Sequence, residues 1–249
     1  MVILEAKEII KSYGPKKVLD GITFQLQQGQ CLGVLGGSGS GKSVLMRSMI
    51  GLEGLDAGMI YFKGQRIDHL QEEELFTIRQ KVAYIFQSGA LFDSETVYAN
   101  VAFSLWEHSH LPEAQVNSKV QQALSNLGLK DNDQIKPSEL SGGMQKRVSI
   151  ARALVMDPEI LIFDEPTAGL DPNNTKKIAN IILDLKSKNL SLIIVTHDLP
   201  LAAKVCDEVL LIEEGKVAYQ GKATEFEQDT APAVKRFLGE EEVNHETNQ

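Results

Sequence analysis

The sequence has little cysteine and no run of apolar residues long enough to cross a bilayer. Its two cysteines, Cys31 and Cys206, are too few for a disulfide framework, and two thiols so distant in the chain offer too few ligands for a metal site. We therefore expect two reduced, mostly buried thiols. No stretch approaches the roughly 18 apolar residues of a membrane span, and acidic residues follow the N-terminus at once, so we expect neither a span nor a signal peptide.

Basic charge is also scarce. The 249 residues carry 25 Lys and Arg against 34 Asp and Glu, a formal net charge of −9, and no basic tract stands out. Duplex DNA or RNA is therefore not expected as a partner. Hydrophobic residues make up 43% of the chain, which is typical of a globular protein, and its length is enough for one large domain or two small ones.

A glycine-rich octapeptide is the most informative segment that is present. It fits the phosphate-binding pattern G-x-x-x-x-G-K-[ST] at every fixed position. Its residues are Gly36, Gly37, Ser38, Gly39, Ser40, Gly41, Lys42 and Ser43. An apolar run at 31–35 precedes it and helical periodicity follows at 44–50, which is the strand–loop–helix context that the motif requires. Glycines let backbone approach a phosphate, and the N–H groups at the start of the helix face the anion. We expect Lys42 to reach the β- and γ-phosphates of a nucleotide and the Ser43 hydroxyl to bind Mg²⁺.

Strand and helix patterns alternate along the chain. Residues 2–30 are rich in β patterns, and further buried strands are indicated by short apolar runs at 59–62, 82–86, 160–163, 192–195 and 209–212. Residues 88–150 instead show helical periodicity, and another helix is predicted at 176–188. This alternation predicts a largely parallel sheet covered on both faces, with a mostly helical insertion.

Two adjacent acids, Asp164 and Glu165, follow the strand pattern at 160–163. Ligands of parallel α/β folds bind at the carboxyl edge of the sheet, where these side chains would project. We expect Asp164 to hold Mg²⁺, usually through water, and Glu165 to act as general base toward an attacking water. Beside a phosphate loop, these roles are favoured over two merely exposed acids.

The segment Leu140-Ser141-Gly142-Gly143-Met144 resembles the signature of the ATP-binding cassette (ABC) transporter family, and the resemblance extends over about residues 3–222. It implies an α/β P-loop NTPase fold: a RecA-like core with an N-terminal antiparallel β subdomain, plus an inserted α-helical subdomain. The single domain of 1–249 would then divide into a core of about 1–87 and 151–222, a helical subdomain of about 88–150, and a C-terminal tail of about 223–249.

The signature has a physical logic of its own. Ser141, Gly142 and Gly143 precede a helix pattern, so they predict a second helix N-terminus suited to an anion. In the family this terminus faces the γ-phosphate bound by the other protomer. Because the chain carries one phosphate loop and one signature, the resemblance implies a homodimer that encloses two ATP molecules.

The resemblance gives roles to further residues. Gln87 resembles the residue that touches Mg²⁺ and the attacking water, and His197 resembles the switch histidine that contacts the γ-phosphate. Tyr13 resembles the aromatic residue that stacks on adenine, although a strand-packing role stays open. Asp171 resembles the main polar contact of the loop that couples the two sites. Val44 completes the predicted nucleotide-binding set where relatives usually have Thr, and its side chain should point away from phosphate.

Several short segments resemble the Mla-type branch of the family, whose ATPases drive lipid transport between the two membranes of diderm bacteria. They are 41–44, 86–93 and 141–144, where Met144 replaces the usual Gln. This implies an ATPase on the cytoplasmic face of the inner membrane, beneath an integral-membrane permease and a phospholipid-carrying periplasmic protein of the mammalian-cell-entry (MCE) type. A small regulatory subunit stays open. The alternatives are an importer of amino acids or other small solutes, and a soluble ABC ATPase of iron–sulphur cluster assembly.

Two surfaces have more than one interpretation. Ala90, Leu91 and Phe92 either receive the permease's coupling helix or are buried within the helical subdomain. Val234, Phe237 and Leu238 predict a short amphipathic helix that packs either on its own subunit or on the other protomer. The polar residues 239–249 are predicted to be disordered.

Overall fold

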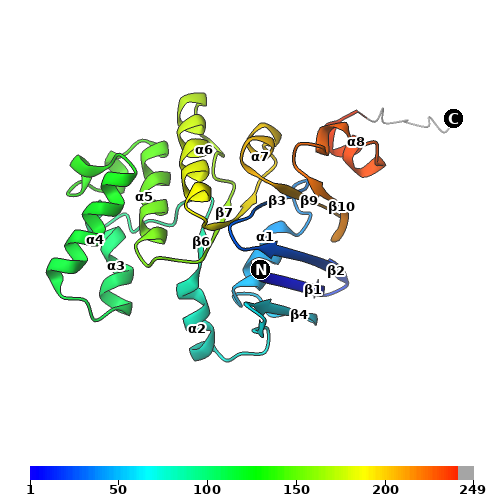
Figure 1. The fold of residues 1–249 in the computed structure, drawn as a ribbon, viewed down its shortest axis with the longest axis horizontal. Coiled ribbons are helices and arrows are strands. Elements are labelled where there is room, and N and C mark those ends of the chain that lie inside the picture. The colour runs from blue at the N-terminus through cyan, green and yellow to red at the C-terminus, as the bar shows by residue number, and fades with distance from the viewer. Residues whose placement is uncertain (241–249) are drawn as a thin grey trace.

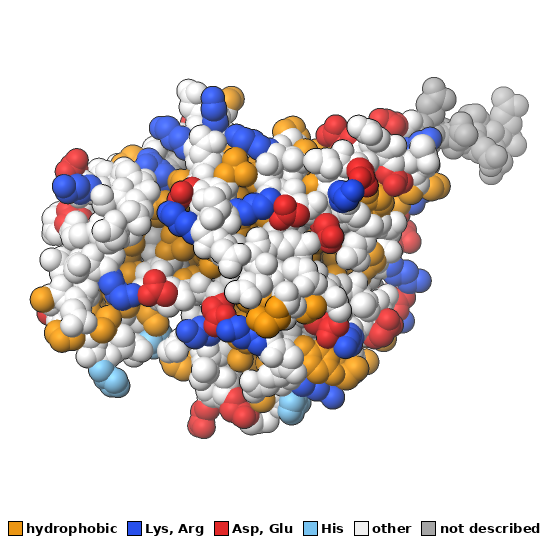
Figure 2. All heavy atoms as spheres, viewed as in Figure 1, with side chains coloured by type: hydrophobic (Ala, Val, Ile, Leu, Met, Phe, Trp, Pro, Cys, Tyr) orange, Lys and Arg blue, Asp and Glu red, His pale blue; other side chains and the backbone are white. Residues whose placement is uncertain are grey.

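A computed structural model describes residues 1–240 as two β-sheets surrounded by helices (Figure 1). Residues 239–249 are predicted to be disordered, and of these, 241–249 lie outside the described residues. Within residues 1–240, no helix combines the length and the apolar character needed to cross a membrane. On the face drawn in Figure 2, acidic and basic side chains are interspersed, and apolar side chains lie between them.

The N-terminal half contributes a four-stranded antiparallel sheet in the order β2-β1-β4-β5. The strands are β1 (Val2–Tyr13), β2 (Lys16–Gln27), β4 (Ala57–Phe62) and β5 (Gln65–Arg66). In β2 the buried residues Ile22, Phe24 and Leu26 alternate with exposed polar ones, so one face of the sheet packs on the core. This agrees with the predicted antiparallel β subdomain.

The second sheet has six strands in the order β10-β9-β3-β8-β7-β6. They are β3 (Cys31–Leu35), β6 (Val82–Ile85), β7 (Ile160–Asp164), β8 (Ser191–Val195), β9 (Glu208–Glu213) and β10 (Lys216–Lys222). The first five strands in sequence run parallel, whereas β10 pairs antiparallel with β9 at the edge. The parallel strands are almost fully buried, as expected for a sheet covered on both faces.

Helices cover both faces of this sheet. The apolar face of α1 (Lys42–Met49) packs between the two sheets, in a core shared with β1, β2 and β4. The opposite face is covered by α5 (Gly142–Leu154), α6 (Pro172–Ser187) and α7 (Leu199–Val205). In Figure 1, α3 (Val97–His108) and α4 (Glu113–Asn126) form a lobe with α5, and α2 (Glu72–Lys81) lies below β6. The predicted fold class is confirmed.

The structure differs from the sequence-based expectation in several places. The strand β10 and the helix α2 were not predicted. The signature helix α5 continues to Leu154, so it crosses the boundary placed at about residue 150. The helix α6 begins four residues before 176, because the Asp171 carboxylate caps its N-terminus and Pro172 fits its first turn. Three short 3₁₀ segments complete the fold, at Lys130–Asn132, Pro137–Glu139 and Phe226–Gln228.

The described part of the tail packs on its own chain. The predicted short helix is present as α8 (Pro232–Leu238), where Val234 is fully buried. The ring of Phe237 lies 6.0 Å from that of Phe226, and Arg236 forms an ion pair with Glu213 at the end of β9. This supports the first of the two interpretations of the tail, while contact with another protomer stays a prediction.

The two cysteines are buried free thiols, as expected, but they are not distant in space. The Sγ atoms of Cys31, at the start of β3, and Cys206, after α7, are 3.9 Å apart. Sequence separation was misleading here, because α7 returns the chain to the strand beside β3.

Candidate functional site

The phosphate loop joins β3 to α1, and its glycines are required by its shape. Gly36 and Gly41 have φ angles of +152° and +103°, and a Cβ on either would lie within 2.8 Å of a backbone oxygen. In contrast, a Cβ built on Gly37 or Gly39 would meet nothing within 4 Å. The loop therefore combines a backbone shape that only glycine adopts readily with open space on one side, which fits a bound phosphate. A cavity of about 240 Å³ borders it, lined by Lys16, Val18 and residues 39–44.

Lys42 is the first residue of α1, and its side chain folds back over the loop. Its Nζ donates hydrogen bonds to the carbonyl oxygens of Gly36 and Gly37, at 2.7 and 2.8 Å. Burial lowers the pKa of Lys42, and the carboxylates of Glu165 and Asp164 oppose this effect. The ammonium group thus stands where the phosphates of a nucleotide would enter.

A carboxylate and two hydroxyls meet beside the start of α1. Oδ2 of Asp164, at the end of β7, lies 3.4 Å from Oγ of Ser43 and accepts a hydrogen bond from the Tyr84 hydroxyl at 2.7 Å. Burial and this carboxylate raise the pKa of Tyr84 well above its usual range. A hydroxyl and a carboxylate are oxygen donors that Mg²⁺ accepts, so Ser43 and Asp164 fit the ion expected there. Sequence reasoning missed Tyr84.

Glu165 and His197 come together from neighbouring strands. Asp164 pairs with Val195, so the residues that follow β7 and β8 emerge side by side. Glu165 has a left-handed backbone, with φ at 48°, and its N–H donates to Val195 O at 2.8 Å. Its Oε1 lies 2.9 Å from Nδ1 of His197, and its Oε2 accepts from Thr196 Oγ1 at 3.3 Å. The carboxylate is mostly buried, whereas His197 is 70% exposed.

A buried lysine of the signature helix links two of these segments. Nζ of Lys146 donates to the backbone oxygen of Gln87, and it lies 3.4 Å from that of Glu165. Burial lowers the pKa of Lys146, opposed by the charges of Asp164 and Glu165. Sequence reasoning did not single out this residue, although it lies one helical turn after Gly142, within the signature helix.

The signature and the Asp171 loop pack against each other. Ser141 caps α5, because its side chain accepts from the N–H of Met144. A Cβ on Gly143 would lie 2.5 Å from the Asn174 side chain, which itself bonds to the Asp171 carboxylate. Within residues 1–240, no hydrogen bond joins this cluster to the phosphate loop. The predicted site residues thus fall into two groups on one chain.

Two predicted residues lie at the margin of the site. The exposed Tyr13 ring ends β1, with Lys11 Nζ 5.3 Å from its centroid, and it does not line the cavity beside the phosphate loop. A hydrogen bond from Tyr13 to Glu53 raises the pKa of the phenol. The Gln87 side chain is exposed and makes no hydrogen bond within residues 1–240, so its contact with Mg²⁺ stays a prediction. A third predicted residue, Val44, is half-buried against the core and lines the cavity beside the phosphate loop.

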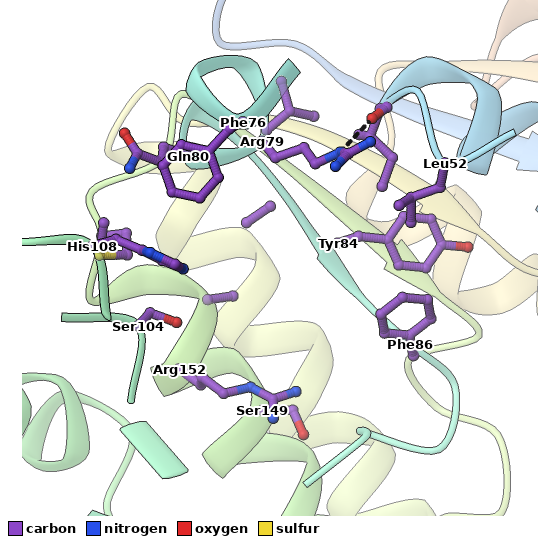
Figure 3. Close-up of a pocket in the computed structure, with 15 residues that line it drawn as sticks. Leu52, Phe76, Arg79, Gln80, Tyr84, Phe86, Ser104, His108, Ser149 and Arg152 are labelled. Atoms are coloured by element: carbon purple, nitrogen blue, oxygen red, sulfur yellow. Dashed lines mark hydrogen bonds between the residues drawn. The ribbon is translucent and has the colours of Figure 1, made fainter. Parts of the chain in front are cut away.

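A separate hollow of about 340 Å³ opens between α2, β6, α3 and α5. Figure 3 shows Phe76 and His108 on one side and Leu52, Tyr84 and Phe86 on the other. The rings of Phe76 and His108 meet edge to face at 4.7 Å. Its wall combines these apolar and aromatic side chains with the charged side chains of Arg79 and Arg152, and it is backed by the β6 strand that leads to Gln87.

Comparisons with known proteins agree with this geometry. The family model described as ABC transporter matches residues 19–168. The chain is 39% identical over 254 residues to Protein TRIGALACTOSYLDIACYLGLYCEROL 3, chloroplastic, of Arabidopsis thaliana, covering 95% of this chain and 73% of that protein. It is 37% identical over 242 residues to the methionine import ATP-binding protein MetN of Carboxydothermus hydrogenoformans, covering 96% and 71%.

The fold is similar to that of a solved cassette. The dimeric, post-hydrolysis structure of the ATP-binding cassette MJ0796 bound to ADP and Pi superposes with a TM-score of 0.82 at 27% identity, covering 89% of this chain and 99% of that one. ATP-binding cassettes of this kind dimerise and pair with permeases. The chain therefore belongs to the ABC transporter family, as an ATP-binding subunit that hydrolyses ATP.

Proposed function

We propose that this ATPase drives phospholipid transport between the inner and outer membranes of a diderm bacterium, from the cytoplasmic face of the inner membrane. The support is a relative that is 39% identical over nearly the whole chain and whose name contains a galactolipid, trigalactosyldiacylglycerol. The segments 41–44, 86–93 and 141–144 favour the same branch. The partners would be an integral-membrane permease, an MCE-type periplasmic lipid-binding protein and, in some complexes, a small regulatory subunit.

The site residues would divide the work of hydrolysis. The loop glycines and Lys42 bind the phosphates, and Ser43 and Asp164 hold Mg²⁺, which would offset charge on the phosphate oxygens. Glu165, placed against His197, takes the proton of the attacking water, and His197 contacts the γ-phosphate. Gln87 would join the metal site on closure, since its backbone is already anchored near Glu165 by Lys146.

A second copy would complete each site. Ser141 and Gly142 are exposed at the N-terminus of α5, and Gly143 is buried behind them. This helix N-terminus lies in a different cluster from the phosphate loop, which suits binding of the partner protomer's γ-phosphate. Tyr13 would stack on adenine through its exposed ring. The Asp171 carboxylate caps α6 within its own chain, so its contact across the dimer would use a preformed turn.

The hollow beneath α2 is the proposed docking site for the permease's coupling helix. A hollow with many apolar side chains is the kind of groove that receives a helix. It adjoins the segment 89–92, because Ser149 and Arg152 in its wall donate hydrogen bonds to the backbone oxygens of Gly89 and Ala90. Leu91 is half-buried against the helical lobe, whereas Phe92 is 42% exposed with its ring 4.9 Å from that of Phe103. Of the two interpretations of this segment, burial therefore applies to Leu91, and Phe92 stays available for docking.

A charge introduced in the hollow beneath α2, or beside it on the segment 89–92, should disrupt the complex with the permease and leave the subunit folded. Phe76 lines the hollow, and the ring of Phe92 lies beside it, 6.0 Å from Cζ of Arg152 in its wall. We expect Phe76→Asp and Phe92→Asp to lower permease co-purification about ten-fold or more, because each replaces an apolar ring at the interface with a carboxylate that must lose its water. Trp106→Asp is the matched control, since Trp106 is 45% exposed on α3 and does not line the hollow. Thermal melting and ATP binding of the isolated subunit confirm folding. Permease capture that survives both Phe76→Asp and Phe92→Asp would disprove docking here.

The nearest alternative is an importer of a small solute such as an amino acid, and it rests on the 37% identity to MetN. Purification of the tagged chain from detergent-solubilised native membranes, with mass spectrometry of proteins and lipids, separates the two. A permease with an MCE-type protein and phospholipid is the expected result. Components of a solute importer would contradict the proposal, and purely soluble partners would favour a soluble ABC ATPase.

A further inference from the structure

Tyr84 reaches the candidate metal site from an edge strand that no nucleotide-binding motif includes. It lies on β6, opposite Ile162 of β7, so its side chain meets the carboxyl end of that strand. Its hydroxyl is 2.7 Å from Oδ2 of Asp164, closer than the 3.4 Å between that oxygen and Ser43 Oγ. Within residues 1–240, it makes the shorter of the two hydrogen bonds to this carboxylate.

Packing fixes where the phenol points. The Tyr84 ring lies 4.6 Å from the Phe86 ring, measured between centroids, and both line the hollow beneath α2 (Figure 3). The side chain is half-buried, and the rest of it packs on the core shared with α1. A tyrosine side chain has only two torsions, so these contacts fix the position of the hydroxyl oxygen, and that position is within hydrogen-bond distance of Asp164.

The hydrogen bond has a direct consequence for the carboxylate. The Tyr84 hydroxyl has one proton to donate, and it donates this proton to Oδ2 of Asp164. No hydrogen bond within residues 1–240 engages the other carboxylate oxygen, Oδ1 of Asp164. The bond therefore sets the rotation of the carboxylate and leaves one oxygen available to an ion or its water. Groups that orient a metal ligand in this way tune metal affinity without touching the metal.

We propose that Tyr84 is a positioning residue that holds Asp164 in the orientation that binds the divalent cation. The proposal rests on the magnesium site proposed for Ser43 and Asp164. It predicts that loss of the hydroxyl weakens metal binding and leaves metal-free nucleotide binding intact, because Tyr84 faces the carboxylate and does not line the phosphate cavity.

The test measures metal binding directly, by electron paramagnetic resonance of Mn²⁺ added to the full chain saturated with ADP. For Tyr84→Phe we expect Mn²⁺ affinity to fall about 10-fold or more, the range typical for loss of an outer partner of a metal ligand. Affinity for a fluorescent ADP analogue in EDTA should stay within about two-fold of the unmodified chain. Tyr98→Phe is the matched control, because its hydroxyl faces Glu113 at 3.5 Å, outside the site.

A second variant separates the hydroxyl from the ring. Tyr84→Met removes both and should weaken Mn²⁺ binding as much as Tyr84→Phe does. The proposal is wrong if Tyr84→Phe binds Mn²⁺ like the unmodified chain, or if only Tyr84→Met weakens Mn²⁺ binding. It is also wrong if the affinity of Tyr84→Phe for the ADP analogue in EDTA falls as much as its affinity for Mn²⁺. Failure of the unmodified chain to bind Mn²⁺ with ADP would instead remove the magnesium site itself, and this proposal with it.

Discussion

Glu165→Gln is expected to bind ATP with near-normal affinity and to hydrolyse it about 10²- to 10⁴-fold more slowly. This is the range for loss of a general base, and an amide cannot accept the proton of the attacking water. The amide can still keep a hydrogen bond with His197 and with Thr196, so the local structure should persist. The measurements are steady-state ATP turnover and equilibrium nucleotide binding.

The same variant should accumulate a dimer in ATP, detected by size-exclusion chromatography, because the closed state is no longer released by hydrolysis. Glu159→Gln provides the control. Glu159 lies just before the first residue of β7, at the end of the strand away from Glu165, and forms an ion pair with Lys63. Its turnover should match the unmodified chain. Brisk turnover by Glu165→Gln would remove Glu165 from the role of base.

Lys42→Ala is expected to lose nucleotide affinity and activity together. Hydrogen bonds to charged groups contribute about 1.5–3 kcal/mol, which corresponds to roughly a 10- to 150-fold weaker ATP complex. The substitution also removes the two bonds that tie Lys42 to Gly36 and Gly37, so the empty loop should loosen as well. Isothermal titration with a non-hydrolysable ATP analogue measures the affinity.

Lys222→Ala is the comparison for this lysine, because its exposed ammonium pairs with Glu225 and does not line the phosphate cavity. It should bind the analogue like the unmodified chain. If Lys42→Ala kept full affinity and lost turnover alone, Lys42 would act on the transition state and would not be a binding residue.

The parts of the site that sequence predicted depend on contiguous residues. The strand, loop and helix around Gly36–Ser43 follow one another, and Asp164 and Glu165 end a single buried strand. Local periodicity and glycine content are enough to place such features at the edge of a parallel sheet. The same reasoning found a β-rich N-terminal segment and most strands of the main sheet, whereas the antiparallel β subdomain was implied by the resemblance to the ABC transporter family.

What sequence missed depends on which strands become neighbours. Tyr84 meets Asp164 across 80 residues because β6 pairs with β7, and a single tyrosine in a short strand carries no signal of that pairing. Lys146 looks like an ordinary solvated residue of α5, yet it is buried between Gln87 and Glu165. The contact between Cys31 and Cys206 likewise needs the path of α7 to be known.

We propose above that ATP hydrolysis at this site drives phospholipid transport. The most direct measurement reconstitutes the native complex of this chain with its permease into vesicles that contain fluorescent phospholipid, and follows transfer between the vesicles and an acceptor, in either direction, when ATP is added. We expect phospholipid transfer that requires ATP and is lost with Glu165→Gln. ATP-driven uptake of radiolabelled methionine without phospholipid transfer would contradict it.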